Sequence, residues 1–438
     1  MKIVFNDPTF SALLLRTIAE TYYKGADIGE CLSTAYRIKE GDFESWYEQW
    51  IKTAKRVHSY AEESATNGHT TSAREAYLRA TNYYRTAAFP IVDPEDKRLS
   101  STIDLSKGCF KKAVSLFPFV VEPIEIPYEG TSLPGYFYHV PKGYNHHENS
   151  QLNESDPVSQ KSSVAGNDNI YESYVNSVAY PTLVVHGGFD STLEELYCLA
   201  AAPALERGYN CLTFEGPGQG NVSIRQKLPF RYDWEKVVTP VLEFALSKKN
   251  EYNIDPNKIA LMGISMGGYL AARVVSFEQR FSAAILYDGV YDGYDSIKAG
   301  FPSELSYAVE KGDSEFVNSY ITRLMEADSN IRFNIQHGMY TTGSKTPYEL
   351  ISGAKVYSVK DIIKNIKTPI LVLEGEKDDS FPGQAKKVYD ELVSVPQAYK
   401  KYILYTEEEG AEEHCQSGVT GLVSQRIFDW LDEIFQIN

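Results

Sequence analysis

Apolar residues follow two different spacings along the chain, and the change falls near residue 118. Before that point they recur at intervals of three and four, which is the spacing of an amphipathic helix with one buried face. Two such runs are Trp46, Trp50, Ala54, Val57 and Ala61, and Ala73, Ala76, Tyr77, Ala80, Tyr83, Tyr84 and Ala87. The pattern therefore predicts an all-helical segment over residues 1–118, which we expect to form an N-terminal cap.

Beyond residue 118, apolar runs of strand length appear, and most of them alternate with helical patterns. Two strands at 121–127 and 135–140 are joined by a turn, and a helix is expected at 192–207. The remaining strands are predicted at 182–185, 210–214, 259–262, 283–287, 369–373 and 402–405. Because alternating strands and helices are typical of an α/β fold, we predict a mostly parallel twisted sheet covered by helices.

Two segments interrupt the predicted core, which comprises residues 119–296 and 359–438. Residues 141–177 are rich in Asn, Ser, His, Asp and Gln and poor in large aliphatic residues, which predicts an exposed polar insertion. About eighty residues separate the sixth and seventh predicted strands, far more than one crossover needs. Their helical pattern predicts an inserted helical cap at 297–358, over the strand ends where open α/β sheets bind ligands.

Charge and composition exclude several classes of protein. Lys and Arg total 43 against 59 Asp and Glu, the net charge is −16, and no basic cluster would follow a phosphate backbone, so nucleic acid is excluded as a partner. No segment has the pattern of a membrane span or a signal peptide, so we expect a cytoplasmic protein. The cysteines and histidines form no C-x-x-C or H-x-x-x-H pair, so neither a metal nor a cofactor is predicted.

The most specific chemical motif is Gly-Ile-Ser-Met-Gly at 263–267. Residues 259–262 predict a strand before it, and residues 269–275 predict a helix after it, which is the setting of a nucleophile elbow. In such a turn the serine adopts a strained backbone conformation, and the small glycines avoid collisions. We therefore predict Ser265 as a nucleophile and the Met266 N–H as one donor of an oxyanion hole.

A serine hydroxyl becomes a useful nucleophile only when a base accepts its proton and a carboxylate orients that base. His414 follows the strand predicted at 402–405, and Asp378 follows the strand at 369–373, so the chain order is Ser, Asp, His. Asp379 is the alternative acid. The spacing from the strand end favours Asp378, whereas Asp379 could instead cap the next helix.

The motif His-Gly-Gly-Phe-Asp at 186–190 follows another strand and predicts the second half of the oxyanion hole. Its glycines let the backbone approach a substrate, and the N–H of Gly188 or of Phe189 can point at the developing negative charge. Asp288 and Arg231 are further substrate-binding candidates. Asp288 could instead shape an Asp-Gly turn, and Arg231 could instead pair with a buried acid.

Together these motifs resemble the α/β-hydrolase superfamily. More narrowly, the chain is similar to the group with an N-terminal helical cap that includes 2,6-dihydroxypseudooxynicotine hydrolase, the fermentation-respiration switch protein and the fungal yellowish-green pigment hydrolases. The matching pieces are residues 73–80, 83–85, 186–190, 214–220, 263–268 and 410–416. The chain departs from this group at Glu215, where an aspartate before Gly-Pro-Gly is more usual, and in the polar insertion. The Gly-Pro-Gly-Gln-Gly loop at 216–220 lacks the G-x-G-x-x-G spacing of a nucleotide site.

The resemblance implies hydrolysis of an ester, an amide or a carbon-carbon bond next to a ketone. Combined with the Ser, Asp, His order, it predicts a serine hydrolase acting on an aromatic or polyketide-like small molecule. Two alternatives stay open: an acyl transferase or cyclase that uses the same acyl-enzyme, and a non-catalytic binding or regulatory protein of the same fold. The expected partner is a small-molecule substrate, and a homodimer is compatible with the sequence.

Overall fold

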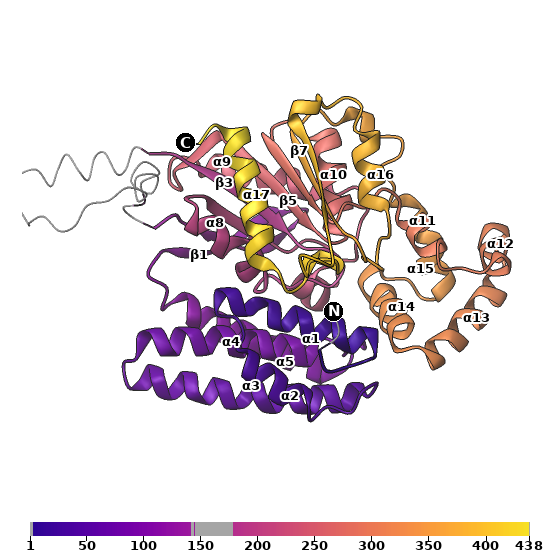
Figure 1. The fold of residues 1–438 in the computed structure, drawn as a ribbon, viewed down its shortest axis with the longest axis horizontal. Helices are drawn as coiled ribbons and strands as arrows, with labels where there is room; N and C mark the ends of the chain where they lie inside the picture. Colours follow the sequence, from indigo (N-terminus) through magenta and orange to yellow (C-terminus); the bar gives the residue numbers. More distant parts are fainter. Residues whose placement is uncertain (1–2, 142–143, 145–177, 438) are drawn as a thin grey trace, which may run out of the picture.

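The computed structural model describes residues 3–141, 144 and 178–437, which form a helical layer, a central sheet and a group of outlying helices (Figure 1). Apart from its residues 141 and 144, the predicted polar insertion at 141–177 lies outside the described residues. No helix in the described ranges combines the length and apolar character needed to cross a lipid bilayer.

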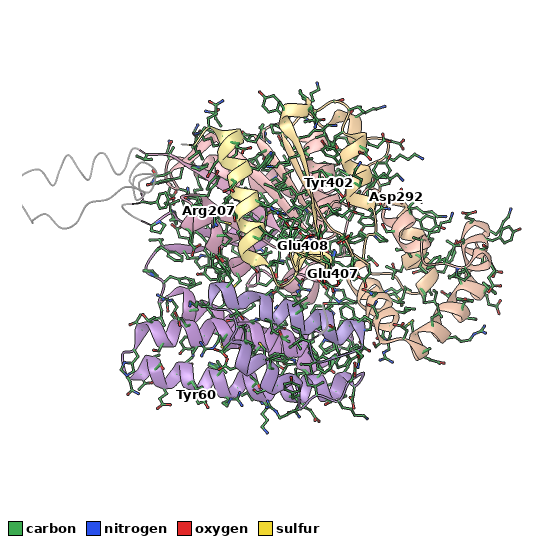
Figure 2. The ribbon with its side chains drawn as sticks, in the orientation of Figure 1. Tyr60, Arg207, Asp292, Tyr402, Glu407 and Glu408 are labelled. Atoms are coloured by element: carbon green, nitrogen blue, oxygen red, sulfur yellow. The ribbon has the colours of Figure 1, made fainter. Side chains whose placement is uncertain are left out.

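Five helices form the N-terminal layer, below the sheet in Figure 1: α1 (Pro8–Ala19), α2 (Ile28–Ala35), α3 (Phe43–Thr66), α4 (Thr70–Ala88) and α5 (Lys97–Val114). Trp46 and Trp50 of α3 are fully buried, and the Trp50 ring lies 5.4 Å from that of Tyr83 on α4. Tyr60, on the outer face of α3, is half exposed (Figure 2). The periodic apolar face predicted by the sequence is thus the face that packs.

Eight strands form one sheet in the order β1-β2-β4-β3-β5-β6-β7-β8. Strands β3 to β8 run parallel, whereas β2 is antiparallel to both β1 and β4. The bounds are β1 (Val121–Tyr128), β2 (Thr131–Tyr138), β3 (Tyr180–His186), β4 (Asn210–Phe214), β5 (Ile254–Ile264), β6 (Ala283–Tyr287), β7 (Ile370–Gly375) and β8 (Lys400–Tyr405). The predicted α/β fold with a mostly parallel sheet is confirmed.

Alternate residues of each strand enter two different cores. Leu183 and Met262 face the N-terminal layer and α17 (Thr420–Phe435), together with a short helix, α8 (Ala202–Glu206). Val184 and Leu261 face the opposite core, formed with α9 (Glu235–Ser247), α10 (Gly267–Phe277) and α16 (Gln384–Glu391). Burial on both faces explains why the parallel strands are continuous apolar runs.

The strand order brings distant loops together at the carboxyl end of the sheet. His186, the last residue of β3, is paired with Gly263 of β5, so the glycine-rich loop after β3 starts beside the serine turn. Tyr287, at the end of β6, is paired with Leu373 of β7. Side chains that follow β3, β5, β6, β7 and β8 therefore meet at one edge, as open α/β sheets require.

The chain between β6 and β7 forms the outlying group of helices, at the right of Figure 1. They are α11 (Gly293–Lys298), α12 (Ser303–Lys311), α13 (Ser314–Ala327), α14 (Ser329–Thr342) and α15 (Pro347–Gly353). Asp292 caps the first of them, with its carboxylate accepting the Asp295 N–H at 2.9 Å (Figure 2). The inserted helices begin a few residues before the predicted start at 297, because this aspartate starts the helix.

The inserted helices also touch the N-terminal layer. Phe333 of α14 stacks on Phe89, just past the end of α4, with ring centroids 4.8 Å apart. Ser329 Oγ, at the start of α14, donates a hydrogen bond of 2.9 Å to Asp7, which caps α1. The two helical regions thus meet each other as well as the core.

Candidate active site

A sharp turn joins β5 to α10, and Ser265 lies at its tip. The backbone of Ser265 has φ +63°, the left-handed conformation that non-glycine residues seldom adopt. A methyl group added to Gly263 would lie 2.0 Å from the Gly267 carbonyl oxygen, so only glycine fits there. The strained serine and the small neighbour are the two features expected of a nucleophile elbow.

Ser265 is hydrogen-bonded to a histidine from the far end of the chain. Its Oγ lies 2.8 Å from Nε2 of His414, and Nδ1 of His414 lies 2.9 Å from Oδ2 of Asp378. Asp378 follows β7 and His414 follows β8, so neighbouring strands bring the two side chains together. The structure places the three predicted residues in one hydrogen-bonded chain.

The structure distinguishes between the two candidate acids. Asp378 is buried, and its other oxygen accepts the N–H groups of Ser380 at 2.8 Å and Phe381 at 3.2 Å. Asp379 is exposed at the rim of the adjoining cavity. Of the pair, Asp378 is the carboxylate that contacts His414.

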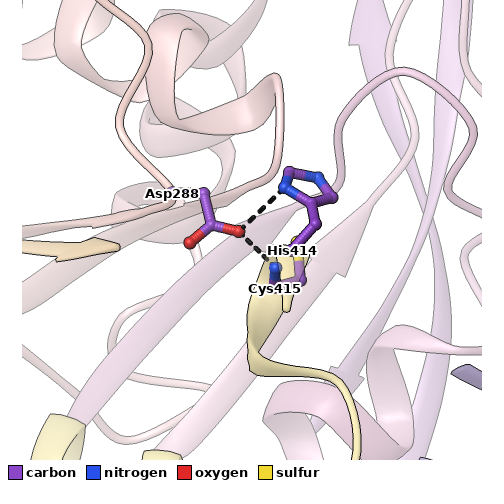
Figure 3. Close-up of side chains that lie close together, drawn as sticks. All are labelled: Asp288, His414 and Cys415. Carbon is purple, nitrogen blue, oxygen red and sulfur yellow. Dashed lines mark hydrogen bonds and ion pairs between the residues drawn. The ribbon is translucent and has the colours of Figure 1, made fainter. Parts of the chain in front are cut away.

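A second carboxylate, Asp288, also faces His414 (Figure 3). Its Oδ2 lies 3.2 Å from Nδ1 of His414 and accepts the Cys415 N–H, while Oδ1 accepts from Gln416 Nε2 at 2.8 Å. Asp288 is 1% exposed and is not among the residues that line the cavity. The structure therefore places it behind the histidine and away from the predicted substrate-binding position.

The pKa values in this cluster follow from burial and charge. Burial tends to raise the pKa of Asp378, but the charge and hydrogen bond of His414 lower it below its usual value. Burial alone would lower the pKa of His414, yet its interactions with Cys415 and with the Asp378 carboxylate raise it well above 6.5. Burial raises the pKa of Asp288 to about 6. This arrangement stabilises an imidazolium at His414.

Asp288, His414 and Cys415 also place ligand-type atoms within 4.8 Å of one another. Burial raises the pKa of Cys415 to about 12, so its sulfur is a protonated thiol, which is a poor metal ligand. Nδ1 of His414 is already directed at two carboxylates. Hydrogen bonding therefore accounts for the grouping.

Two backbone N–H groups beside Ser265 are free to bind an anion. In the described part of the chain, no protein group accepts a hydrogen bond from the N–H of Met266 or of Phe189. The Gly188 N–H, by contrast, donates to Ser191 Oγ at 3.2 Å. Of the two predicted donors from the loop after β3, the structure thus leaves Phe189 available and engages Gly188.

A large, mainly apolar cavity of about 1560 Å³ opens over Ser265 and His414. Its walls come from α1, from the loops after β3 and β4, and from the inserted helices α11, α13, α14 and α15. Arg231 is on this wall, but its guanidinium is bound to Asp233 at 2.7 Å and to Glu129 at 2.8 Å. Arg231 therefore pairs with acids of the protein, the alternative left open by the sequence.

The strand order and the placement of these side chains at the carboxyl ends of the strands define an α/β-hydrolase fold. The model of the alpha/beta hydrolase family matches residues 182–411, and the chain belongs to this family. The narrower group that the sequence resembles is confirmed by the relatives below.

Relatives match over the whole chain. Hydrolase LUC6 of a Fusarium species is 34% identical, covering 100% of this chain and 99% of its own. The 20-hydroxy-prefusarin hydrolase FUS2 of Gibberella moniliformis is 33% identical over the same shares. The crystal structure of 2,6-dihydroxy-pseudo-oxynicotine hydrolase superposes with a TM-score of 0.68 at 20% identity, covering 95% of both chains, which shows a shared fold.

Proposed function

We propose that the protein is a serine hydrolase that cleaves an acyl bond of a polyketide-like small molecule. The observation that supports this most directly is the continuous hydrogen-bonded chain from Ser265 through His414 to Asp378, with contacts of 2.8 and 2.9 Å. The match to FUS2, a relative whose name gives 20-hydroxy-prefusarin as its substrate, supports the substrate class.

In the proposed reaction, Ser265 Oγ attacks a substrate carbonyl while Nε2 of His414 accepts its proton. Asp378 accepts the Nδ1–H, which keeps the Nε2 lone pair directed at the serine and stabilises the imidazolium. The N–H groups of Met266 and Phe189 bind the oxyanion. The leaving group takes the proton from His414 and departs, which leaves the acyl group on Ser265. A water molecule then attacks this acyl group while His414 accepts a proton from the water. His414 returns the proton to Ser265 Oγ as the acyl group is released.

The cavity supports a bulky apolar substrate. Typical pockets for drug-sized ligands measure about 300–1,000 Å³, and this cavity of about 1560 Å³ is larger. The arginines and the lysine that line it, Arg16, Arg231 and Lys377, each pair with an acid of the protein, so they offer little to attract an anionic ligand. An ester, an amide or a carbon-carbon bond next to a ketone would each suit the proposed serine chemistry, and a panel of p-nitrophenyl esters, anilides and β-diketones distinguishes them.

The test of this proposal is Ser265→Ala. We expect the variant to fold, to lose labelling by a fluorophosphonate probe, and to lose turnover by about 10⁴-fold or more. Ser59→Ala is the matched control, because Ser59 is an exposed serine of α3 that does not line the cavity. It should keep both activities. Continued labelling of Ser265→Ala would contradict the proposal.

A further inference from the structure

The Gly-Pro-Gly-Gln-Gly loop after β4 places a buried side chain beneath the loop that follows β3. Gln219 is 1% exposed, and its Nε2 donates to the carbonyl oxygens of Gly187 at 2.7 Å and Gly188 at 3.1 Å. Its Oε1 accepts the Gly216 N–H at 2.9 Å. Because the oxygen is fixed by that donor, the amide nitrogen can only point at the two carbonyls.

The Gly188 carbonyl and the Phe189 N–H belong to the same peptide group. In a planar trans peptide these two groups point in opposite directions, and no cis peptide bond occurs in the described chain. Gln219 binds the carbonyl on the buried side, so the Phe189 N–H points to the other side. Phe189 itself lines the cavity together with Ser265.

We propose that Gln219 is a positioning residue that orients the Phe189 N–H of the oxyanion hole by holding the Gly188 carbonyl. This inference rests on the proposed hydrolase function. It gives a structural role to the Gly-Pro-Gly-Gln-Gly motif, whose glycine spacing does not match a nucleotide site. It also explains the burial of a glutamine whose polar atoms are all directed at backbone groups of two loops.

The backbone around Gln219 is built for this contact. Gly218 has φ +83°, and a methyl group added there would lie 2.2 Å from the Phe230 ring. Glu215, just before the motif, is 2% exposed and joins the same two loops, because it accepts the Leu193 N–H at 2.8 Å and the Asn221 N–H at 2.9 Å. The two loops are therefore held together on either side of Gln219.

Two substitutions test the role of Gln219. Gln219→Met keeps the length of the side chain and removes both donors, whereas Gln219→Glu keeps the acceptor for the Gly216 N–H and can donate only when protonated. The readouts are the second-order rate of labelling by a fluorophosphonate probe, and kcat and KM for a p-nitrophenyl ester. For Gln219→Met we expect labelling and kcat to fall about 10²-fold with KM changed less than about twofold.

Gln226→Met is the matched control. Gln226 also donates to a backbone carbonyl, that of Ser132 at 2.8 Å, but it is not among the residues that line the cavity. It should retain wild-type rates. A loss confined to kcat and labelling separates orientation of an oxyanion donor from general loosening of the fold, which would also change KM and the melting temperature.

The pH dependence of Gln219→Glu is a second test of the positioning role. A neutral carboxylic acid can donate to one carbonyl, whereas an ionised carboxylate repels both, so the deficit relative to wild type should shrink as pH falls. The ratio of the two rates isolates this effect, because His414 titrates in both proteins.

The outcomes are distinguishable. If Gln219→Met stays within about twofold of wild type in labelling and kcat, the positioning role is wrong. If Gln219→Met fails to fold, a rate ratio for Gln219→Glu that is independent of pH overturns it. If Ser265→Ala is still labelled, the hydrolase function fails first. An unlabelled Ser265→Ala beside a fully active Gln219→Met rejects this inference alone.

Discussion

One ring nitrogen of His414 faces two carboxylates that have different surroundings. Asp378 is the nearer, at 2.9 Å against 3.2 Å, and two backbone N–H groups stabilise its charge. Asp288 is bound to Cys415 and Gln416, whose backbones have positive φ of 53° and 43°. Because such conformations need support from their surroundings, we infer that Asp288 stabilises the turn that carries His414.

This difference predicts the effects of two substitutions. Asp378→Asn should lower kcat by about 10²–10⁴-fold, because the amide cannot accept the Nδ1–H as a charged partner. Asp288→Asn should lower it by about 10-fold, through the turn. Steady-state kinetics of the two variants measure both losses. A larger loss in Asp288→Asn would identify Asp288 as the acid that orients His414.

The pH dependence of Asp378→Asn gives an independent test of the role of Asp378. His414 must be neutral to accept a proton, so kcat/KM rises with pH through the pKa of His414, which lies above 6.5 in the wild type. Removing the carboxylate destabilises the imidazolium and lowers that pKa, so the acid limb of the profile should move to lower pH. An acid limb that stays in place or moves to higher pH would contradict the role of Asp378.

Residue order alone predicted much of this site. Ser265, Asp378 and His414 each follow a strand, and the predicted strands of a parallel sheet end at one edge. The contact between Asp288 and His414 could not be predicted in the same way, because it depends on the pairing of β6 with β7. The engagement of the Gly188 N–H depends on one hydroxyl, that of Ser191, whose rotamer no pattern reveals.

At the scale of elements, both helical regions hold the loop after β3. His337 of α14 contacts the Phe189 carbonyl through Nε2 at 3.1 Å and stacks on Phe333 with ring centroids 5.3 Å apart. Arg16 of α1 binds Asp190 at 3.0 Å. The loop that provides a proposed oxyanion donor is thus fixed from the two sides that also enclose the cavity.

His337→Phe tests the contribution of α14. Burial lowers the pKa of His337, so the ring is neutral at pH 7 and serves as a single N–H donor to the Phe189 carbonyl. Phenylalanine keeps the stacking on Phe333 and removes the donor. We expect labelling by the fluorophosphonate probe to slow by about 3- to 10-fold. His69→Phe, at an exposed position in the N-terminal layer, is the control, and equal rates in the two variants would contradict the prediction.

Element type was more predictable than element geometry. The helix expected at 192–207 is instead a π-helical turn at Tyr197–Ala201 followed by the short α8. Pro203 explains the difference, since its ring crowds the carbonyl of Leu199 and it lacks an N–H for the helical ladder. The N-terminal helices, which have long periodic faces and no interior proline, lie within the predicted segment.

At the scale of the whole molecule, the cavity is assembled from three parts of the chain: the N-terminal layer, the core and the inserted helices. The contact between Phe89 and Phe333 illustrates why its shape could not be predicted, because one ring follows α4 and the other lies on α14, far apart in the sequence. Patterns of apolar spacing identify a helix face to be buried but do not identify its partner. The resulting wall includes α1, which provides a position for testing substrate size.

Ala12 of α1 is exposed and lines the cavity, so a larger side chain there would reduce the space available to a substrate. We expect Ala12→Trp to leave fluorophosphonate labelling and cleavage of p-nitrophenyl acetate unchanged while it excludes long acyl chains. Each methylene group that the tryptophan keeps out of the cavity loses about 0.8 kcal/mol of burial free energy. Loss of three methylene groups would therefore lower the ratio of kcat/KM for p-nitrophenyl dodecanoate to kcat/KM for p-nitrophenyl acetate by about 50-fold. Ala65→Trp, on an exposed position of α3 away from the cavity, is the matched control. Equal ratios in the two variants would show that α1 does not border the bound acyl chain, and the substrate would then have to lie against the inserted helices and the loops of the core.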